Sequence, residues 1–334
     1  KVTCGVSALP GGRLAACLYS RDSIVAFDGA NGLPCWSHRF ERPGELLPVE
    51  VIDGALFAAC GQVLQAIDAA TGRIHWETSM DSPVERVIAT AGAVLASTER
   101  GGIAAFHPQS GGQLWRQDLS GSRLWAVSGR HVIVSSNPSQ SRAKMDTILT
   151  LDLASGNEQW RIQSGTTAAR LSADNGRLYF LGWNNRLDVF HLENGRQIWA
   201  LEGVPAEADS YWTNEEINLV FCDERLLAVD PGNGAPQWQI QAGEYEVLSV
   251  MIDAQADAIY IGTDEGRVAS LDLLTGTERW SLSLPSRSVE NIFVDADNNV
   301  EKVVETVNAD VSQVIPDGKG RLFVVAEGML FAVG

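Results

Sequence analysis

The chain has little cysteine and little basic charge, and each shortage argues against a class of function. Five cysteines stand among 334 residues, with no Cys-x-x-Cys pair, so zinc ribbons and thioredoxin chemistry are poorly supported. We expect Cys17 and Cys60, which lie in apolar runs, to be buried small hydrophobic residues. The chain carries 25 Lys and Arg against 42 Asp and Glu, a net charge of −17. This charge argues against nucleic-acid binding, because phosphate contacts need clustered cations.

Sequence motifs for catalysis or metal binding are also missing. The chain holds no Gly-x-Ser-x-Gly elbow, His-Glu-x-x-His pair or phosphate-binding loop. The three histidines outside the repeat described below share no ligand spacing. A segment that starts at Asp295 resembles a calcium loop, but Val300 and Thr306 stand where glycine and glutamate are needed. We therefore predict no enzyme activity and no metal site.

Long apolar runs are absent as well. No stretch approaches the roughly 18 apolar residues of a membrane helix, and no apolar leader lies near the amino terminus. The first residue is Lys1 rather than Met, so we expect a processed protein or a domain cut from a longer one. We expect no transmembrane segment in this chain, and a location in the periplasm or at the cell surface, with the cytoplasm left open.

What the sequence does have is a repeat. An 11-residue phrase, Ala-x-Asp-x-x-x-Gly-x-x-x-Trp, occurs seven times in exact or varied form, at intervals of roughly 40 residues, the period of a four-stranded propeller blade. Each copy follows two short apolar runs that predict a hairpin, and its Asp and Gly suit a tight turn. We predict that the tryptophans are structural and fill the space between neighbouring blades, burying about 150–250 Å² each. They are Trp36, Trp76, Trp115, Trp160, Trp199, Trp238 and Trp280.

The count of hairpins favours eight blades over seven. The predicted fold is all-β, an eight-bladed β-propeller of four-stranded antiparallel blades, in a single domain over 1–334 with an insertion at about 285–310. The last hairpin lacks the turn and the tryptophan, so we expect Lys1 to Val6, or sequence upstream, to complete the last blade, because unpaired edges invite aggregation. The hairpins are expected at 13–27, 55–67, 93–106, 131–151, 178–190, 218–229, 258–271 and 321–333.

The phrase resembles the tryptophan-docking motif of the PQQ-repeat propeller family, and it spans nearly the whole chain. Departures exist, because His107 and His191 replace the Asp, where we expect them to cap the turn. The family includes quinoprotein alcohol dehydrogenases, the periplasmic outer-membrane assembly lipoprotein BamB, and sensor domains of bacterial kinases. The adjacent cysteines typical of the dehydrogenases are absent, so that activity is not expected. Cys4 follows Val2-Thr3, which is not the Leu-rich lipobox that a BamB-like lipoprotein would carry.

Several aromatic and basic residues outside the phrase are candidate binding residues. Hairpin bends and blade connections emerge on one propeller face, so we expect these residues to share it. Aromatic rings with guanidinium groups suit a flat anionic ligand or a protein segment. Ion pairs with neighbouring carboxylates are the alternative explanation for two of the arginines, Arg225 and Arg267. The candidates are Trp125, Trp183, Arg186, Tyr211, Trp212, Arg225 and Arg267.

We therefore predict a non-catalytic β-propeller that binds a protein partner or a small anionic ligand on one face, as an extracytoplasmic scaffold or a sensor domain. One alternative is a PQQ-binding sensor domain of a receptor kinase. The other is a BamB-like outer-membrane protein assembly factor. No cofactor is expected for the leading function, whereas PQQ would be the cofactor of the first alternative.

Overall fold

The computed structural model describes the protein as a succession of small β-sheets. Every regular element in the described ranges is a β-strand, and no helix there is long and apolar enough to cross a membrane. The described residues are 4–9, 13–18, 23–28, 31, 33–41, 44–137, 146–204, 210–213, 217–222, 225–241, 247–253, 256–285, 287–294, 300–307, 310–316, 322–326 and 329–333.

The chain forms two compact units. Unit 1 comprises Lys1–Asn184 and Asp188–Gln197, and unit 2 comprises Asn185–Leu187 and Ile198–Gly334. Four sheets lie wholly in unit 1, and each contains four antiparallel strands in sequence order. They are β1 (Cys4–Leu9), β2 (Arg13–Leu18), β3 (Ser23–Asp28) and β4 (Pro34–Arg39); β5 (Glu50–Ile52), β6 (Ala55–Cys60), β7 (Val63–Asp68) and β8 (Ile74–Ser79); β9 (Val84–Ala89), β10 (Val94–Thr98), β11 (Gly102–Phe106) and β12 (Gln113–Asp118); and β13 (Ser122–Ser128), β14 (His131–Ser136), β15 (Thr147–Asp152) and β16 (Glu158–Gln163).

A fifth sheet has residues in both units, and the remaining sheets lie in unit 2. The fifth sheet contains β17 (Ala168–Asp174), β18 (Arg177–Gly182), β19 (Arg186–His191) and β20 (Gln197–Glu202). Unit 2 contains β21 (Ser210–Thr213), β22 (Asn218–Cys222), β23 (Arg225–Val229) and β24 (Pro236–Gln241); β25 (Val247–Asp253), β26 (Ala258–Thr263), β27 (Arg267–Asp272) and β28 (Glu278–Ser283); the pair β29 (Arg287–Val294) and β30 (Val300–Val307); and β31 (Val311–Pro316), β32 (Leu322–Ala326) and β33 (Met329–Val333).

The eight predicted hairpins are confirmed. Each one forms a pair of neighbouring strands, from β2–β3 in the first sheet to β32–β33 in the last. The segment after each of the first six motif tryptophans supplies the first strand of the next four-stranded sheet, as the length of the repeat predicted. The pair β29–β30 lies in the range where we expected an insertion, and Arg287 pairs with Val307 at its open end.

The structure differs from two predictions, one about the strand near the amino terminus and one about the number of four-stranded blades. Residues near the amino terminus form β1, which pairs with β2 so that Cys4 lies opposite Cys17. They therefore complete the first sheet, and the prediction that Lys1 to Val6 complete the last one is wrong. The last hairpin forms a three-stranded sheet with β31. The described residues thus form seven four-stranded sheets, and a count of eight such blades is not confirmed.

The core lies between neighbouring sheets. Second and third strands such as β7 and β10 are buried along almost their whole length, because another sheet covers each face. Fourth strands are mostly exposed, and in β8 and β12 the tryptophan is the one fully buried position. One cluster, for example, joins Leu95 and Ile103 of β10 and β11 to Leu124 of β13. Cys60 is buried as predicted, whereas the side chain of Cys17 lies outside the described residues.

Each docked tryptophan reaches into the turn of the following repeat. The indole of Trp115 donates a hydrogen bond to the carbonyl oxygen of Leu153 at 2.8 Å. Its ring also covers Gly156, where a Cβ atom would lie only 2.5 Å from the ring. The same ring-over-glycine contact joins Trp36 to Gly72, Trp76 to Gly111, Trp160 to Gly195, Trp199 to Gly234 and Trp238 to Gly276. The glycine of the phrase is therefore needed both for its backbone angles and for the space it leaves.

Candidate binding pocket

The predicted binding residues are spread over both units. Trp125 and Trp183 belong to unit 1, and the other five belong to unit 2, so neither unit groups all seven in one site. Trp183 is 58% exposed, and it lies between β18 and β19. The Arg186 guanidinium pairs with Glu202 at 2.7 Å across β19 and β20.

Trp125 is buried, contrary to the expectation of an exposed aromatic face. It is 8% exposed, and its indole donates a hydrogen bond to Ser135 Oγ at 2.8 Å. The ring packs with residues of β14, β15 and β18, so it is part of the core between two sheets. Arg267 pairs with Glu278. The side chains of Tyr211, Trp212 and Arg225 lie outside the described residues.

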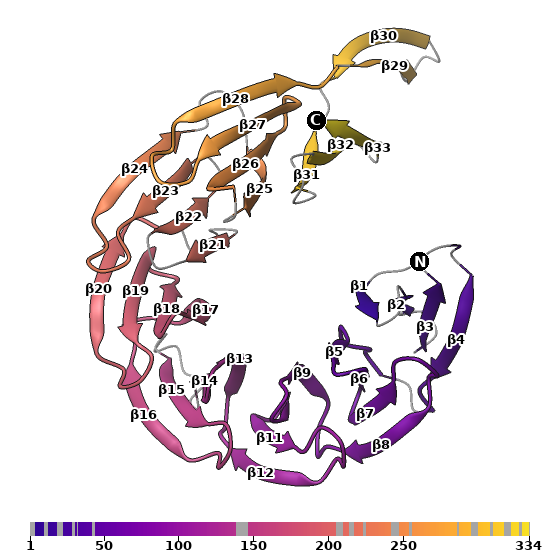
Figure 1. Cartoon of the computed structure of the whole chain (residues 1–334), viewed down its shortest axis with the longest axis vertical. Helices are drawn as coiled ribbons and strands as arrows, with labels where there is room; N and C mark the ends of the chain where they lie inside the picture. The colour runs from indigo at the N-terminus through magenta and orange to yellow at the C-terminus, as the bar shows by residue number, and fades with distance from the viewer. Residues whose placement is uncertain are drawn as a thin grey trace. The chain divides into compact units, whose positions relative to one another are not determined.

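A pocket that sequence reasoning missed lies beside the first strands of three successive sheets in unit 1. In Figure 1, β5, β9 and β13 run along one side of their sheets, and β8, β12 and β16 run along the other. The first strands also contact one another, β5 with β9 and β9 with β13. The pocket has a volume of about 880 Å³ and is lined by Glu45, Leu47, Pro48, Glu50, Val84, Glu85, Arg86, Val87, Ser97, Glu99, Gly121, Ser122, Arg123 and Leu124.

An irregularity at the start of β9 separates the charged and apolar side chains of this lining, because the pairing of β9 with β10 shifts register between Ser97 and Thr98. In β9, Val84 and Val87 are buried, whereas the adjacent Glu85 and Arg86 are both exposed. Arg86 lies directly opposite Ser97 in the register of β9 and β10, so the two side chains share a face of the sheet. Ser97 is 1% exposed, and its hydroxyl has no hydrogen-bond partner among the described residues.

Two arginines give the pocket its electrostatic character. Within the described part of the chain, no ion pair or hydrogen bond holds the guanidinium of Arg86 or Arg123. The pKa of Arg86 is lowered, first by loss of water around the group and then by the nearby charge of Arg123, while Glu50 acts in the opposite direction. Burial raises the pKa of Glu50, and Arg86 lowers it. Arg86 and Glu50 are thus each partly shielded from water, and each offsets the other's shift only in part.

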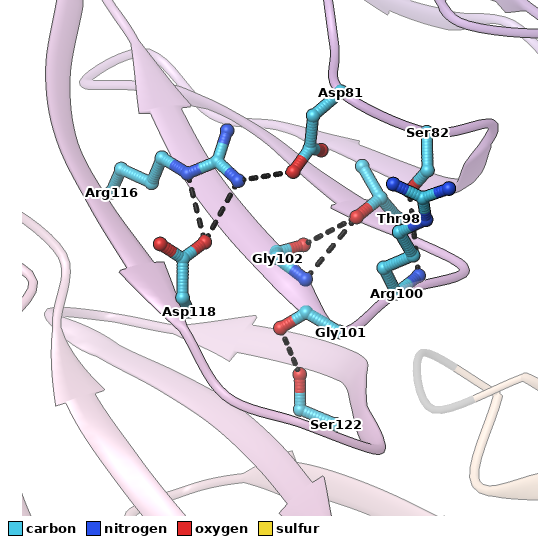
Figure 2. Close-up of polar contacts among 9 residues, drawn as sticks. All are labelled: Asp81, Ser82, Thr98, Arg100, Gly101, Gly102, Arg116, Asp118 and Ser122. Carbon is cyan, nitrogen blue, oxygen red and sulfur yellow. Dashed lines mark hydrogen bonds and ion pairs between the residues drawn. The ribbon is translucent and has the colours of Figure 1, made fainter.

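Figure 2 shows how the loop next to the pocket is held in place. Arg116 on β12 donates one hydrogen bond to Asp118 at 2.9 Å and another to Asp81 at 2.6 Å. The hydrogen bond from Arg116 lowers the pKa of Asp81. Because Asp81 precedes β9, this contact ties the connection between the second and third sheets to the outer strand of the third sheet.

A second set of contacts in Figure 2 joins the third sheet to the fourth. The hydroxyl of Ser122, which lines the pocket, donates to the carbonyl oxygen of Gly101 at 2.9 Å. The backbone N–H of Gly102 donates to Thr98 Oγ1 at 3.2 Å. These bonds fix the turn between β10 and β11 against the start of β13, so the pocket wall is preorganised.

A smaller pocket in unit 1 lies at the opposite ends of the strands, beside the turns. It has a volume of about 660 Å³, and alanine, glycine and turn backbone form much of its lining. The Nε2 atom of His75 lies 3.6 Å from Oδ2 of Asp68. His107 accepts a hydrogen bond from the backbone N–H of Gln109 at 3.3 Å, which confirms that it caps the turn in place of the usual Asp.

The described residues contain no group of three metal-ligating side chains placed to hold an ion. The segment that starts like a calcium loop, 295–299, lies outside the described residues. The larger pocket of unit 1 differs from the smaller one in having two arginines, Arg86 and Arg123, in its lining.

Comparison with known proteins places this geometry in a family. A family model described as outer membrane protein assembly factor BamB, of the PQQ-repeat type, matches residues 20–129, 99–239 and 144–328. An assembly factor BamB from Nitrosomonas eutropha is 29% identical over 129 residues, 34% of this chain and 32% of the relative. BamB from Yersinia pestis is 27% identical over 192 residues, covering 53% and 48%. The serine/threonine-protein kinase AfsK of Streptomyces coelicolor is 28% identical over 155 residues, covering 44% and 18%.

In each of these three relatives the match spans less than half of the relative's own length. Solved structures resemble the chain over more of its length. BamB from Moraxella catarrhalis superimposes with a TM-score of 0.58 at 15% identity, over 99% of this chain and 95% of that one. The WD40 domain of Sif2 gives a TM-score of 0.62 at 10% identity, over 96% and 92%. The chain belongs to the PQQ-repeat family of BamB-like β-propellers.

Proposed function

We propose that this chain is a non-catalytic, protein-binding propeller that acts as a BamB-like outer membrane protein assembly factor. The observation that carries this proposal is the family match over residues 20–328, together with relatives that bear that name. In this proposal the three-stranded sheet β31–β33 is the eighth blade, and the protein works outside the cytoplasm without a cofactor.

Genetic complementation tests the assembly function. The full-length gene that encodes this chain is expressed in a bacterium that lacks its own BamB, and the level of outer-membrane porins is measured. We expect the porin level to rise towards that of the wild type. An empty vector is the control, and an immunoblot establishes that the protein is exported and stable. Unchanged porin levels with a stable, exported protein would contradict the assembly function.

A second candidate function is a ligand-binding sensor domain, which the similarity to the kinase AfsK supports. If the ligand is PQQ, titration of the purified chain should quench its tryptophan fluorescence. Trp183, exposed at a hairpin bend, is then expected to report the ligand, so Trp183→Ala should remove much of the quench. Fluorescence that does not change with PQQ would contradict the PQQ alternative, and a kinase domain encoded in the same gene would support the sensor.

A further inference from the structure

We propose that Arg86 and Arg123 form a carboxylate-binding pair, and that the pocket between β5, β9 and β13 takes a peptide segment carrying one carboxylate between cationic residues. This inference rests on the proposed protein-binding function and names the chemistry that the partner presents to this pocket. The first support is the state of the two guanidinium groups. Arg116, Arg186 and Arg267 all pair with carboxylates of the chain. Among the described residues no carboxylate lies within ion-pair distance of Arg86 or Arg123, and Glu50 attracts Arg86 only from further away.

A guanidinium without an ion-pair partner can bind a carboxylate specifically. It offers five N–H donors in a planar fork that matches both oxygens of a carboxylate. Arg86 and Arg123 stand on neighbouring first strands that contact each other, and both line the same cavity of about 880 Å³. This volume lies within the range of about 300–1,000 Å³ found for ligand sites, so the cavity can take a short peptide segment.

The position of Arg123 is set before any ligand arrives. Its guanidinium lies over the ring of Trp125, 4.4 Å from the ring centre, and Trp125 is itself fixed by its hydrogen bond to Ser135. Stacking of this kind leaves the N–H groups at the edge of the guanidinium able to donate. A side chain that is already ordered loses less entropy when the ligand binds.

The two arginines also have unfavourable electrostatic energies that a bound anion would reduce. Arg86 and Arg123 repel each other, and Arg86 has lost part of its water. A carboxylate between them would offset both effects. Ser97, opposite Arg86, adds a buried hydroxyl without a partner, which a turn of its side chain would make available to a ligand held by Arg86.

The surrounding carboxylates decide which kind of anion fits. Glu45, Glu50, Glu85 and Glu99 also line the pocket, Glu50 already attracts Arg86, and the whole chain has a net charge of −17. A free polyanion would be repelled by this field. A carboxylate flanked by lysine or arginine satisfies both the arginine pair and the glutamates around it, and such an arrangement is available in a peptide.

The test measures binding of a defined probe to the purified chain. The probe is a fluorescent, end-blocked Lys-Gly-Asp-Gly-Lys peptide, compared by anisotropy at low salt with its analogue that has Asn in place of Asp. We expect the Asp peptide to bind at least about tenfold more tightly, and Arg86→Gln and Arg123→Gln each to remove at least about tenfold of its affinity. The control variant Arg161→Gln, which removes an arginine paired with Glu158, should leave affinity unchanged.

A second measurement keeps the proposal testable if a variant is unstable. Phenylglyoxal, an arginine-selective reagent, is applied to the wild-type chain, and modified sites are located by mass spectrometry. We expect Arg86 and Arg123 to react faster than the paired Arg116 and Arg267, and the Asp peptide to protect them.

Equal binding of the Asp and Asn peptides, or labelling of Arg86 and Arg123 that the Asp peptide does not slow, would overturn the proposal. Acetate that displaces the peptide at the same concentration would overturn the peptide part, because the site would then take any small carboxylate. None of these three results bears on complementation by the full-length gene, so this proposal can fail separately from the assembly function.

Discussion

Two tryptophans in the same sequence phrase, Trp115 in the third repeat and Trp280 in the seventh, have different environments. Trp115 is 7% exposed, is hydrogen-bonded to Leu153 and covers Gly156. Trp280 is 38% exposed, and its ring centre lies 6.2 Å from that of Tyr260. The phrase at Trp115 is followed by another complete repeat, whereas the chain after Trp280 continues into β29. A motif tryptophan therefore docks only when the next repeat provides a turn to receive it.

Removal of the two rings should give the largest difference. We expect Trp115→Ala to lower the free energy of unfolding by about 3–5 kcal/mol, because the buried ring leaves a cavity between sheets. Trp280→Ala should cost about 1 kcal/mol, because much of its ring already faces solvent. Chemical denaturation of both variants measures these values. Similar losses would show that docking on the next repeat adds little.

The same contact can be broken from the glycine side. Gly156→Ala should lower the free energy of unfolding by about 2–4 kcal/mol, because the added Cβ meets the ring of Trp115 and a positive φ disfavours alanine. The matched control is Gly176→Ala, since Gly176 has φ of 70° but nothing within 4 Å of an added Cβ. It should cost about 1 kcal/mol, from the backbone alone. An equal effect at both positions would mean that the ring moves aside freely.

Docked tryptophans also differ in the hydrogen bond of the indole. Trp115 donates to a backbone oxygen, whereas the indole N–H of Trp238 is buried without a partner among the described residues. Replacing each by phenylalanine removes similar apolar area, so the costs should differ by about 1 kcal/mol, with Trp115→Phe the more destabilising. Thermal unfolding of the pair measures the difference. A larger loss for Trp238→Phe would contradict this account.

The stability that the turn of the seventh repeat contributes should depend on pH, although Trp280 does not pack on the turn of a following repeat. Hydrogen bonds from Arg279 and then Thr275 lower the pKa of Asp272 from its ordinary 3.8 to about 2. Since the folded pKa is below the unfolded one, this stabilisation is present above pH 3.8 and is lost as pH falls through about 2.

The check is denaturation of the wild type and Asp272→Asn from pH 6 to pH 2. The wild type should be the more stable at pH 6, and the difference should shrink as the pH falls from 4 towards 2, because the protonated carboxyl and the amide both lack charge. A difference that does not change with pH would show that the carboxylate charge contributes nothing to this turn.

The candidate site was harder to predict from the sequence than the fold was. Sequence reasoning selected tryptophans and arginines in bends and connections, and of these Trp183 is exposed while Trp125 is in the core. It missed Arg86 and Arg123, although a signal was present, since each stands beside a buried apolar residue in the first strand of a sheet. Nothing in one strand tells whether its charged residue meets a carboxylate of the next sheet. That pairing depends on how neighbouring sheets pack.

The sequence by itself determined the strands, the hairpins and the place of the tryptophans, because these follow from local alternation, turn residues and a period of roughly 40 residues. Tertiary structure alone decided that β1 joins the first sheet, that Trp280 stays partly exposed, and that Arg86 and Arg123 share a pocket with no ion-pair partner among the described residues. The physical reason is that hairpins form between neighbours in the chain. Edge pairing, burial and charge compensation depend instead on residues that packing brings together from separate repeats.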